Sequence, residues 1–567
     1  MADAFSHFGT KVFSIFILCI SLGAIGCTST VTSPDTICIT TPHPTFCKSI
    51  LPDKPGRTIH DYGRFCLSRA VSDTDRFLQL INQHLESGSQ YPESTIRALE
   101  DCQVLVSLNQ DFFSTTSTSI GATNSTLPAS TASLVQTLLS AVMTNVQTCS
   151  DGLDQAIGSS SSPVSDLRPY ISNGTLVSSV SLALVTQGWG SHGANARQLK
   201  EEEPLISHWP RKTLSYAKNS HLNNDYRPLG LQGTRRGRKM LQVDGLNVNA
   251  SNVIVVNPNG SGNFTTINDA IAAAPNNTKA GSGYFVIRVV AGVYKEYVSI
   301  PKNKQYLMMA GDGINKTIIT GNHSVVDGWT TFNSATFAVV AEGFLAVNIT
   351  FRNTAGAIKQ QAVAVRNGAD LSTFYRCSFE AYQDTLYAYS LRQFYRECNI
   401  YGTVDFIFGN AAVVFQDCNI FPRQPLQGQF NTITAQGRTD PNQNTGTSIQ
   451  GATITAAPDL IASNFTVQSY LGRPWKNYSR TVFMESYMSS VINPAGWAEW
   501  SGTFALDTLY YAEYNNTGPG SNTSERVSWP GYHIINATVA VEFTVSDFIS
   551  GDNWLPPTGV PYTGGLL

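Results

Sequence analysis

The sequence predicts an all-β parallel β-helix in its C-terminal half and an all-α up-and-down helical bundle before it. The β-helix is predicted by a repeat: Cys377, Cys398 and Cys418 recur at spacings of 21 and 20 residues, each at the end of a strand-like run. A repeat of this length is typical of solenoids built from short strands. In the N-terminal half, apolar residues instead recur at helical intervals, as at Leu78, Ile81 and Leu85.

Residues 1–27 have the features of a secretory signal. Lys11 precedes an apolar run from Val12 to Ile20, which is short for a membrane span. We expect a cleaved signal peptide, with a retained signal anchor as the alternative. Acceptor sequences for N-linked glycans agree with export and occur, among other places, at Asn124, Asn173, Asn249, Asn315, Asn348, Asn464, Asn477, Asn515, Asn522 and Asn536.

Residues 28–190 are predicted to form the helical bundle, because strand alternation is absent and Leu134, Leu138 and Val142 continue the helical pattern. A Ser/Thr-rich interruption is expected near 114–132. Residues 191–241 have many breakers and little periodicity, which favours a linker.

The linker ends in a basic cluster, Arg235-Arg236-Gly237-Arg238-Lys239-Met240-Leu241. Such a cluster in an exposed segment between two unlike domains suits a processing protease. An ordinary charged linker is the alternative.

The ten cysteines, two of them in the signal region, are expected in an oxidising compartment. Cys377 and Cys398, one rung apart, would have Cα atoms about 5 Å apart, within disulfide reach. Cys398 with Cys418 is an equally good pair on this ground, so the alternatives stay open. Cys66 is left over.

Residues 242–567 are rich in short Val/Ile/Phe runs punctuated by Gly and Asn, such as 253–256 and 285–290. Parallel rungs buried on their inner face need such runs. A helix at 266–274 is expected to cap the open end of the β-helix. The whole chain has a net charge of −3, so nothing global indicates nucleic acid or a membrane.

A column of polar residues follows the same repeat. Asp384 and Asp405 are 21 residues apart, and Gln361 precedes Gln383 by 22. Neighbouring rungs would bring the two carboxyl groups close together, so that one holds a proton near neutral pH. The pair then supplies a nucleophile and a general acid, and the carboxamides can donate to an oxyanion. A structural ladder of hydrogen-bonded side chains is the alternative reading of the spacing.

Arg473 and Trp475, in Leu-Gly-Arg-Pro-Trp, extend this constellation. A guanidinium can hold a carboxylate bidentately, and a Trp can stack on a sugar, although a core Trp is commoner. Candidates for lining a carbohydrate groove are Tyr382, Tyr387, Phe406, Trp475 and Trp497. The region lacks a Gly-x-Ser-x-Gly motif and zinc-ligand spacing, so we expect neither a common serine hydrolase nor a metal site.

With these motifs the chain resembles the plant pectin methylesterases. The resemblance covers essentially all of 250–567 and is carried by residues 292–296, 361–366, 382–386, 402–410 and 471–475. It implies a right-handed parallel β-helix, a carboxylic ester hydrolase acting on methylesterified homogalacturonan, and no cofactor. It further implies that Asp405 is the nucleophile and that Asp384 is the general acid and base.

The same resemblance assigns the supporting roles. Gln361 and Gln383 would stabilise the oxyanion, with Gln361 also touching substrate. Arg473 would orient Asp405, and Trp475 would contact the sugar. Thr336 is a further substrate contact.

The first half resembles the pectin methylesterase inhibitor family through residues 38–47, 98–102 and 148–152. This resemblance implies disulfides Cys38–Cys47 and Cys102–Cys149, a four-helix-bundle pro-domain that silences the groove or aids folding, and processing at 238–241. The expected protein is a monomer secreted to the plant cell wall, and separate proteinaceous inhibitors are further expected partners.

Two departures and two rivals accompany this interpretation. Asn257-Pro258-Asn259-Gly260 stands where many relatives carry an acidic residue, and 242–567 is slightly acidic, which weakens long-range attraction to polyanionic pectin.

One rival is a depolymerase on the same fold, either a lyase needing a calcium cluster or an inverting hydrolase needing more widely spaced carboxylates. The other is a non-catalytic wall protein acting through its helical half.

Overall fold

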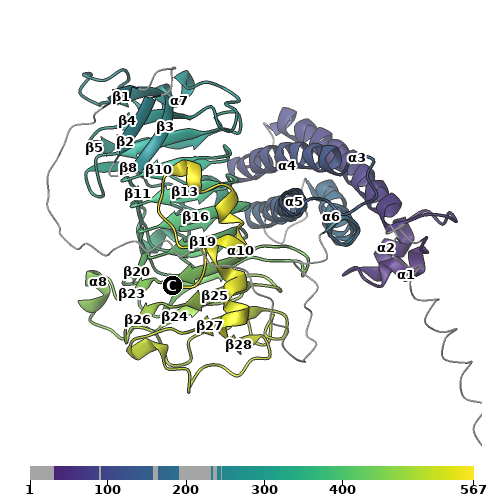
Figure 1. The fold of residues 1–567 in the computed structure, drawn as a ribbon. Helices are drawn as coiled ribbons and strands as arrows, with labels where there is room; N and C mark the ends of the chain where they lie inside the picture. The colour runs from purple at the N-terminus through teal and green to yellow at the C-terminus, as the bar shows by residue number, and fades with distance from the viewer. Residues whose placement is uncertain (1–30, 89–90, 158–163, 191–230, 234–238, 244–245) are drawn as a thin grey trace, which may run out of the picture.

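The computed structural model describes residues 31–88, 91–157, 164–190, 231–233, 239–243 and 246–567. They form a helical bundle and a parallel β-helix that lie against each other (Figure 1). The predicted signal sequence, most of the linker and Arg235–Arg238 of the basic cluster lie outside the described residues. In the described part of the chain, no helix has the length and apolarity needed to cross a membrane.

Four long helices build the bundle. They are α3 (Ile59–Glu86), α4 (Glu93–Ile120), α5 (Ala129–Ile157) and α6 (Arg168–Trp189), preceded by the short α1 (Pro34–Cys38) and α2 (Pro44–Ile50). Disulfides join Cys38 to Cys47 and Cys102 to Cys149, as the resemblance implied. The second disulfide ties α4 to α5, the two helices nearest the β-helix.

The Ser/Thr-rich break is shorter than predicted, because α4 continues to Ile120 and α5 begins at Ala129. Thr118 and Ser119 donate their hydroxyl protons to the carbonyls of Ser114 and Thr115, one turn back. These local bonds satisfy the hydroxyls inside the helix, so the run of polar residues does not end it.

The β-helix has three parallel sheets. The largest has the order β1-β2-β3-β4-β7-β10-β13-β16-β19-β22-β25-β27-β28, with β1 and β2 antiparallel. Its strands are β1 (Leu231–Gly233), β2 (Lys239–Val243), β3 (Leu246–Val256), β4 (Tyr284–Val289), β7 (Leu307–Gly311), β10 (Leu345–Val347), β13 (Ser372–Tyr375), β16 (Arg392–Arg396), β19 (Ala412–Gln416), β22 (Gly446–Gln450), β25 (Arg480–Met484), β27 (Tyr510–Tyr514) and β28 (Tyr532–Ile534). The end of the predicted linker therefore forms strands at the edge of this sheet.

The second sheet contains eight strands: β5 (Gly292–Tyr294), β8 (Thr317–Gly321), β11 (Thr350–Asn353), β14 (Ser378–Glu380), β17 (Asn399–Gly402), β20 (Asn419–Pro422), β23 (Thr453–Ile454) and β26 (Tyr487–Met488). The third contains seven: β6 (Val298–Ile300), β9 (Phe337–Val339), β12 (Val365–Asn367), β15 (Leu386–Ala388), β18 (Ile407–Gly409), β21 (Asn431–Gln436) and β24 (Ser469–Gly472). In each of these two sheets the strands lie side by side in chain order.

The predicted repeat sets the register. Phe374 pairs with Tyr395 and Tyr395 with Phe415, so their rings stack on successive rungs at centroid distances of 5.1 and 4.6 Å. The buried residues of the interior form one continuous core between Val256 and Tyr511, and Ile254, Val527, Trp529 and Tyr532 pack against it. The β-helix therefore completes its main core without any residue of the bundle.

Cys377, Cys398 and Cys418 do fall on one column, but all three are buried free thiols, so the predicted Cys377–Cys398 disulfide is wrong. Residues aligned on parallel strands point the same way, which keeps their Cβ atoms at the strand spacing of about 4.8 Å. A disulfide needs Cβ atoms about 3.8 Å apart. The thiols of Cys398 and Cys418 instead lie 3.4 and 3.6 Å from carbonyl oxygens of the rung before, at Phe374 and Tyr395.

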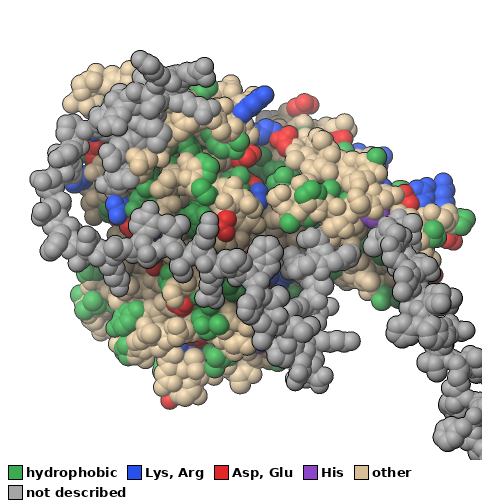
Figure 2. Space-filling view, viewed as in Figure 1, with side chains coloured by type: hydrophobic (Ala, Val, Ile, Leu, Met, Phe, Trp, Pro, Cys, Tyr) green, Lys and Arg blue, Asp and Glu red, His purple; other side chains and the backbone are tan. Residues whose placement is uncertain are grey.

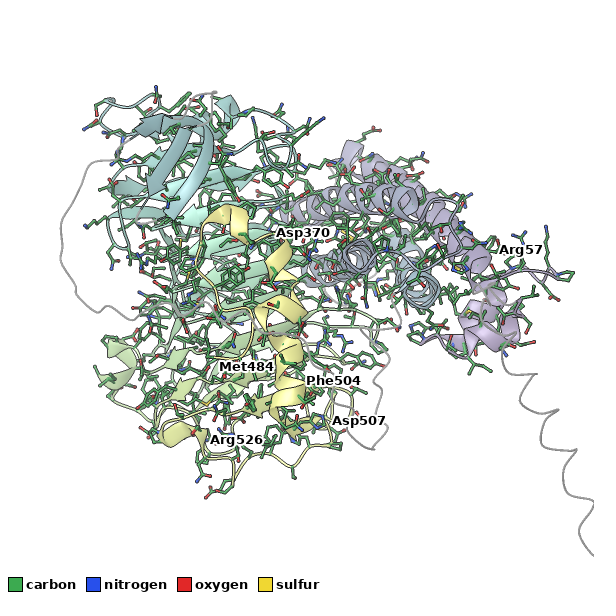
Figure 3. All side chains as sticks on the ribbon, in the orientation of Figure 1. Arg57, Asp370, Met484, Phe504, Asp507 and Arg526 are labelled. Atoms are coloured by element: carbon green, nitrogen blue, oxygen red, sulfur yellow. A yellow bond between two sulfur atoms is a disulfide. The ribbon has the colours of Figure 1, made fainter. Side chains whose placement is uncertain are left out.

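One end and one face of the β-helix are covered. The predicted cap is α7 (Ile267–Ala273), whose Ile267, Ala270 and Ile271 join the core. The C-terminal segment, with α9 (Ala537–Ala540) and α10 (Val545–Phe548), lies along the largest sheet (Figure 1), and a short helix α8 (Pro458–Ile461) precedes β24. Near the C-terminal end Arg526, labelled in Figure 3, forms a buried pair with Glu513 at 2.8 Å.

Candidate active site

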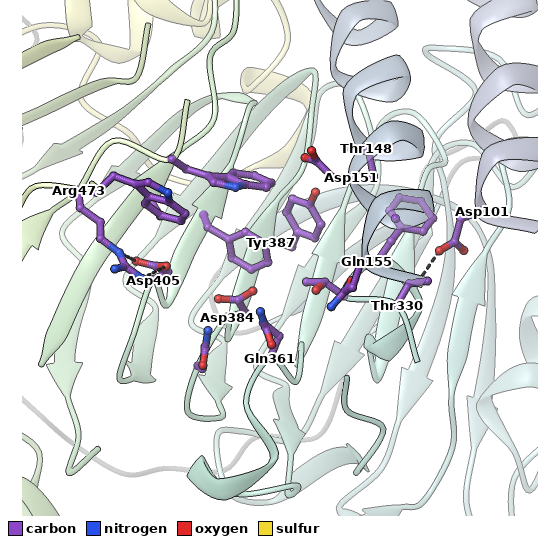
Figure 4. A pocket seen from close by; sticks show the side chains of 18 residues that line it. Asp101, Thr148, Asp151, Gln155, Thr330, Gln361, Asp384, Tyr387, Asp405 and Arg473 are labelled. Atoms are coloured by element: carbon purple, nitrogen blue, oxygen red, sulfur yellow. Dashed lines mark hydrogen bonds and ion pairs between the residues drawn. The ribbon is translucent and has the colours of Figure 1, made fainter. Parts of the chain in front are cut away.

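The predicted site residues lie beside the seven-stranded sheet. Gln361, Asp384 and Asp405 precede β12, β15 and β18, and Arg473 directly follows β24. Because β24, β21, β18, β15 and β12 are consecutive neighbours in this sheet, the four side chains converge on one face (Figure 4). The structure thus brings together the polar column predicted from the spacing.

Asp384 and Asp405 both have left-handed backbone, with φ of 61° and 54°. Only Gly, Asn and Asp enter this region with any frequency, and each such residue costs free energy that its surroundings must offset. Hydrogen bonds to the next rung offset this backbone strain. The amide of Asp384 donates to the carbonyl of Val404 (3.1 Å), and the amide of Asp405 donates to Thr432 Oγ1 (2.8 Å).

The Asp405 carboxylate is 6% exposed and held by three donor groups. Arg473 donates from Nε to Oδ1 at 2.8 Å and from Nη2 to Oδ2 at 2.7 Å. Thr432 Oγ1 donates to Oδ1 at 2.6 Å. A bidentate guanidinium of this kind fixes both the charge and the orientation of the carboxylate.

Arg473 is itself held in place. Burial lowers its pKa, but the hydrogen bonds and charge of Asp405 outweigh that effect and raise the pKa above the usual value. The guanidinium also lies over the ring of Trp500, 4.4 Å from its centroid. Arg473 therefore stays charged in the site.

Asp384 is 7% exposed. Burial, together with the nearby charge of Asp405, raises its pKa well above the ordinary value, and the charge of Arg473 only partly opposes this. The two carboxyl groups are therefore unequal: Asp405 is paired with a guanidinium, whereas the surroundings of Asp384 favour its protonated form. This is the division of roles expected of a nucleophile and a general acid.

The carboxamides line the same cavity as the two Asp residues. Gln361 Oε1 is buried without a hydrogen-bond partner. The carbonyl of Gln383 accepts from the amide of Ala362 (3.3 Å), which places the two glutamines on adjacent rungs. Their N–H groups are available to an oxyanion.

Arg423 supports the turn that carries Gln383 and Asp384. Its guanidinium lies 4.0 Å from the ring centroid of Tyr382 and donates to the carbonyl of Ala381 at 2.8 Å. Tyr382 therefore stabilises the turn, and it is not among the residues that line the cavity.

The aromatic wall is only partly the predicted one. Tyr387 and Trp475 line the cavity, whereas Phe406 and Trp497 are buried in the core. Gly437 makes room for Trp475, since a Cβ at this position would lie 2.7 Å from the indole. Lining residues that the sequence analysis missed are Phe332, Phe408 and Trp500.

Thr336 is not brought to this cavity. Its side chain is fully buried and its hydroxyl donates to the carbonyl of Arg352 at 3.2 Å. Thr432 was also missed, because its role depends on a rung 27 residues beyond Asp405 that breaks the 21-residue period.

The cavity has a volume of about 330 Å³, and helices α4 and α5 of the bundle form part of its wall. The bundle residues that line it are Asp101, Thr148, Asp151, Gly152 and Gln155, and Figure 4 shows Asp101 beside Thr330 at the end away from Asp405. Lys476, next to Trp475, pairs with Asp151 at 2.9 Å. No cluster of His, Cys, Asp or Glu in the described ranges is arranged to hold a metal ion.

Two family models match the chain. The pectinesterase model matches residues 253–552, and the plant invertase/pectin methylesterase inhibitor model matches residues 32–184. The chain belongs to the pectinesterase family. It is a pectinesterase, a carboxylic ester hydrolase with an inhibitor-like N-terminal region.

Relatives and solved structures agree with this assignment. Probable pectinesterase/pectinesterase inhibitor 41 of Arabidopsis thaliana is 55% identical over 551 residues, covering 94% of this chain and 95% of its own. Pectinesterase 2 of Citrus sinensis is 60% identical over 314 residues, which is 55% of this chain and 60% of the relative. The structure of pectin methylesterase from carrot matches with 57% identity and a TM-score of 0.54, over 55% of this chain and 98% of the carrot chain.

Proposed function

We propose that this pectinesterase removes methyl groups from methylesterified homogalacturonan through an acyl-enzyme on Asp405. The observation that carries the proposal is the unequal carboxyl pair: Asp405 is held as a carboxylate by Arg473 and Thr432, and burial beside this charge raises the pKa of Asp384. Gln361 and Gln383 lie in the same cavity as donors.

The steps follow from these states. An oxygen of Asp405 bonds to the ester carbonyl carbon, and the carbonyl electron pair moves to oxygen, where the Gln361 and Gln383 amides stabilise it. The oxyanion collapses, the bond to methoxide breaks, and methoxide takes the proton of Asp384 and leaves as methanol. Asp384, now a carboxylate, takes a proton from water as the hydroxide attacks the mixed anhydride. Asp405 departs as a carboxylate and the galacturonic acid product ionises.

The lining of the cavity supports a uronate polymer as substrate. Tyr387 stacks on Phe408 at 4.1 Å, and Trp475 lies edge-on to both, so apolar ring faces border the polar centre. This combination suits sugars, which present both C–H faces and hydroxyl groups. Thr336 remains a predicted substrate contact that would require movement of the 330–336 segment.

The helical bundle is proposed to inhibit the enzyme in the intact chain. Contacts run from α4 and α5 to the β-helix around the cavity: Asn145 accepts from the Tyr389 hydroxyl (2.7 Å), Asn410 Nδ2 donates to Thr144 (2.9 Å), and Arg97 lies over Trp329. A polysaccharide cannot enter the groove beneath them. Cleavage within 235–241 by a secretory-pathway protease would release the groove, and separate inhibitor proteins would occupy the same face.

We further propose that the enzyme is secreted to the cell wall and acts as a monomer without a cofactor. On the β-helix face shown in Figure 2, acidic and basic side chains are few and interspersed, which fits weak long-range attraction to pectin.

Methanol release from methylated pectin tests the function. The 242–567 fragment is expected to release methanol without producing unsaturated or new reducing ends, whereas the intact chain is much less active. Asp405→Ala is expected to abolish turnover, and Asp507→Ala, at an exposed site outside the cavity, to leave it unchanged. Unsaturated ends would indicate a lyase, new reducing ends a hydrolase, and no reaction a binding protein. Equal activity of the intact and cleaved chains would contradict the inhibitory role of the bundle.

A further inference from the structure

Helix α4 packs two side chains one turn apart, Arg97 and Asp101, onto the segment 328–334 of the β-helix. Asp101, 3% exposed, accepts hydrogen bonds on both carboxyl oxygens, from Thr330 Oγ1 and from Asn333 Nδ2. Both donors are neutral and lie in the segment 328–334, before β9. The β-helix thus presents two neutral hydrogen-bond donors, Thr330 and Asn333, to one carboxyl group, and we call this pair the carboxyl receptor.

Arg97 occupies the neighbouring position. Its guanidinium lies 3.9 Å from the ring centroid of Trp329, and Nη1 donates to the carbonyl of Gly328 at 2.6 Å. The opposite face of Trp329 stacks on His323 (3.7 Å), which in turn stacks on Tyr297 (3.6 Å). The β-helix supports this indole from behind, so only the face covered by Arg97 becomes free when α4 leaves.

This contact lies at one end of the catalytic cavity. Asp101, Thr330 and Phe332 line one end of it, and Asp384, Asp405 and Arg473 line the other (Figure 4). A single oligosaccharide lying in the groove would therefore reach both ends. An aromatic face beside a carboxyl receptor matches the two distinctive parts of a galacturonate unit, its pyranose ring and its carboxylate.

We infer that Trp329, Thr330 and Asn333 form a subsite for an ionised galacturonate unit, which Arg97 and Asp101 occupy in the intact chain. The inference rests on the proposed function, because it takes the groove to bind homogalacturonan. Two hydrogen-bond donors recognise a carboxylate better than a methyl ester, which has one strong acceptor oxygen fewer. The enzyme should therefore favour substrates that already carry a de-esterified unit at this end of the groove.

The state of Asp101 does not conflict with this role. Burial raises its pKa to about 7 in the docked chain. A galacturonate in the open groove would keep more contact with water and stay ionised near neutral pH.

The test uses the 242–567 fragment, which has a core of its own and corresponds to the whole carrot enzyme. Asn333→Asp is nearly isosteric and places a negative charge at the receptor. The matched control is Asn464→Asp, an exposed residue outside the cavity that undergoes the same charge change. The probe is unesterified hexagalacturonate, whose binding is measured by calorimetry.

Asn333→Asp is expected to weaken hexagalacturonate binding by tenfold or more, since it removes a hydrogen bond to a charged group and adds repulsion. High salt should reduce this loss. Binding of the fully methylesterified hexamer should be weakened less than binding of hexagalacturonate, because the esterified oligomer carries no carboxylate for the new charge to repel. Trp329→Ala should weaken the binding of both oligomers, because stacking on the sugar ring does not depend on whether the carboxyl group is esterified.

Equal affinity of Asn333→Asp and Asn464→Asp for hexagalacturonate would overturn the inference and leave 330–333 as a docking surface for the bundle only. Asn333→Ala serves the same test if Asn333→Asp does not fold. Methanol release by the unaltered fragment reports on the proposed function separately, so failure of that reaction is distinguishable from failure of the subsite.

Discussion

The contact between Asp101 and the β-helix should make release of the bundle depend on pH. Burial raises the pKa of Asp101 from an ordinary value of 3.8 to about 7 while the bundle is docked. A carboxyl group with a raised pKa stabilises the docked state fully in acid, and this contribution is lost as the pH rises from about 4 to about 7. The difference corresponds to on the order of 4 kcal/mol, or up to about a thousandfold in the docking constant.

Asp101→Asn tests this reasoning, because the amide cannot ionise and keeps one acceptor oxygen for the same donors. The assay is the dissociation constant of bundle and β-helix in chain cut within 235–241, measured between pH 5 and 7.5. The unaltered protein should bind far more weakly at pH 7.5 than at pH 5, and Asp101→Asn should change only a fewfold. An identical pH dependence in the two proteins would refute the assignment of the effect to Asp101.

Three further outcomes are expected in the catalytic centre. Arg473→Lys should lower kcat at least tenfold with a smaller effect on KM, since an ammonium cannot hold Asp405 bidentately; an unchanged kcat would contradict the orienting role. Thr432→Val should lower kcat and cost about 1–3 kcal/mol of stability by leaving the amide of Asp405 unpaired, whereas Thr432→Ser should restore both. Asp384→Asn should abolish turnover and raise thermal stability more at pH 8 than at pH 5, because a buried carboxyl group with a raised pKa loses stability as the pH rises; equal effects at both pH values would argue against a protonated Asp384.

The repeat in the sequence was sufficient to predict the β-helix, because the rungs in the region 373–414 have nearly constant length. Alignment of Phe374, Tyr395 and Phe415 follows directly from that spacing. The convergence of Gln361, Asp384 and Asp405 was predictable for the same reason. The stacking of Cys377 on Cys398 did not imply a disulfide, however, because the register determines which residues are neighbours but does not bring their Cβ atoms within disulfide distance.

Some site residues could not be predicted from the sequence, because their positions depend on longer or irregular rungs or on contacts between the two domains. Thr432 follows an irregular connection from β20 to β21, so no fixed period connects it to Asp405. The pairing of Asp101 with Thr330 and Asn333 joins residues more than 200 positions apart on surfaces that carry no repeat. Trp500 reaches Arg473 from a turn-rich segment after β26 for which hydrophobic patterning gives no register.

The acyl-enzyme on Asp405 is tested most directly by rapid-quench mass spectrometry of the 242–567 fragment mixed with methylesterified hexagalacturonate. We expect a transient galacturonyl adduct on the peptide that contains Asp405, formed together with methanol and absent from Asp405→Asn. An adduct on another residue, or undiminished methanol release by Asp405→Asn, would contradict it.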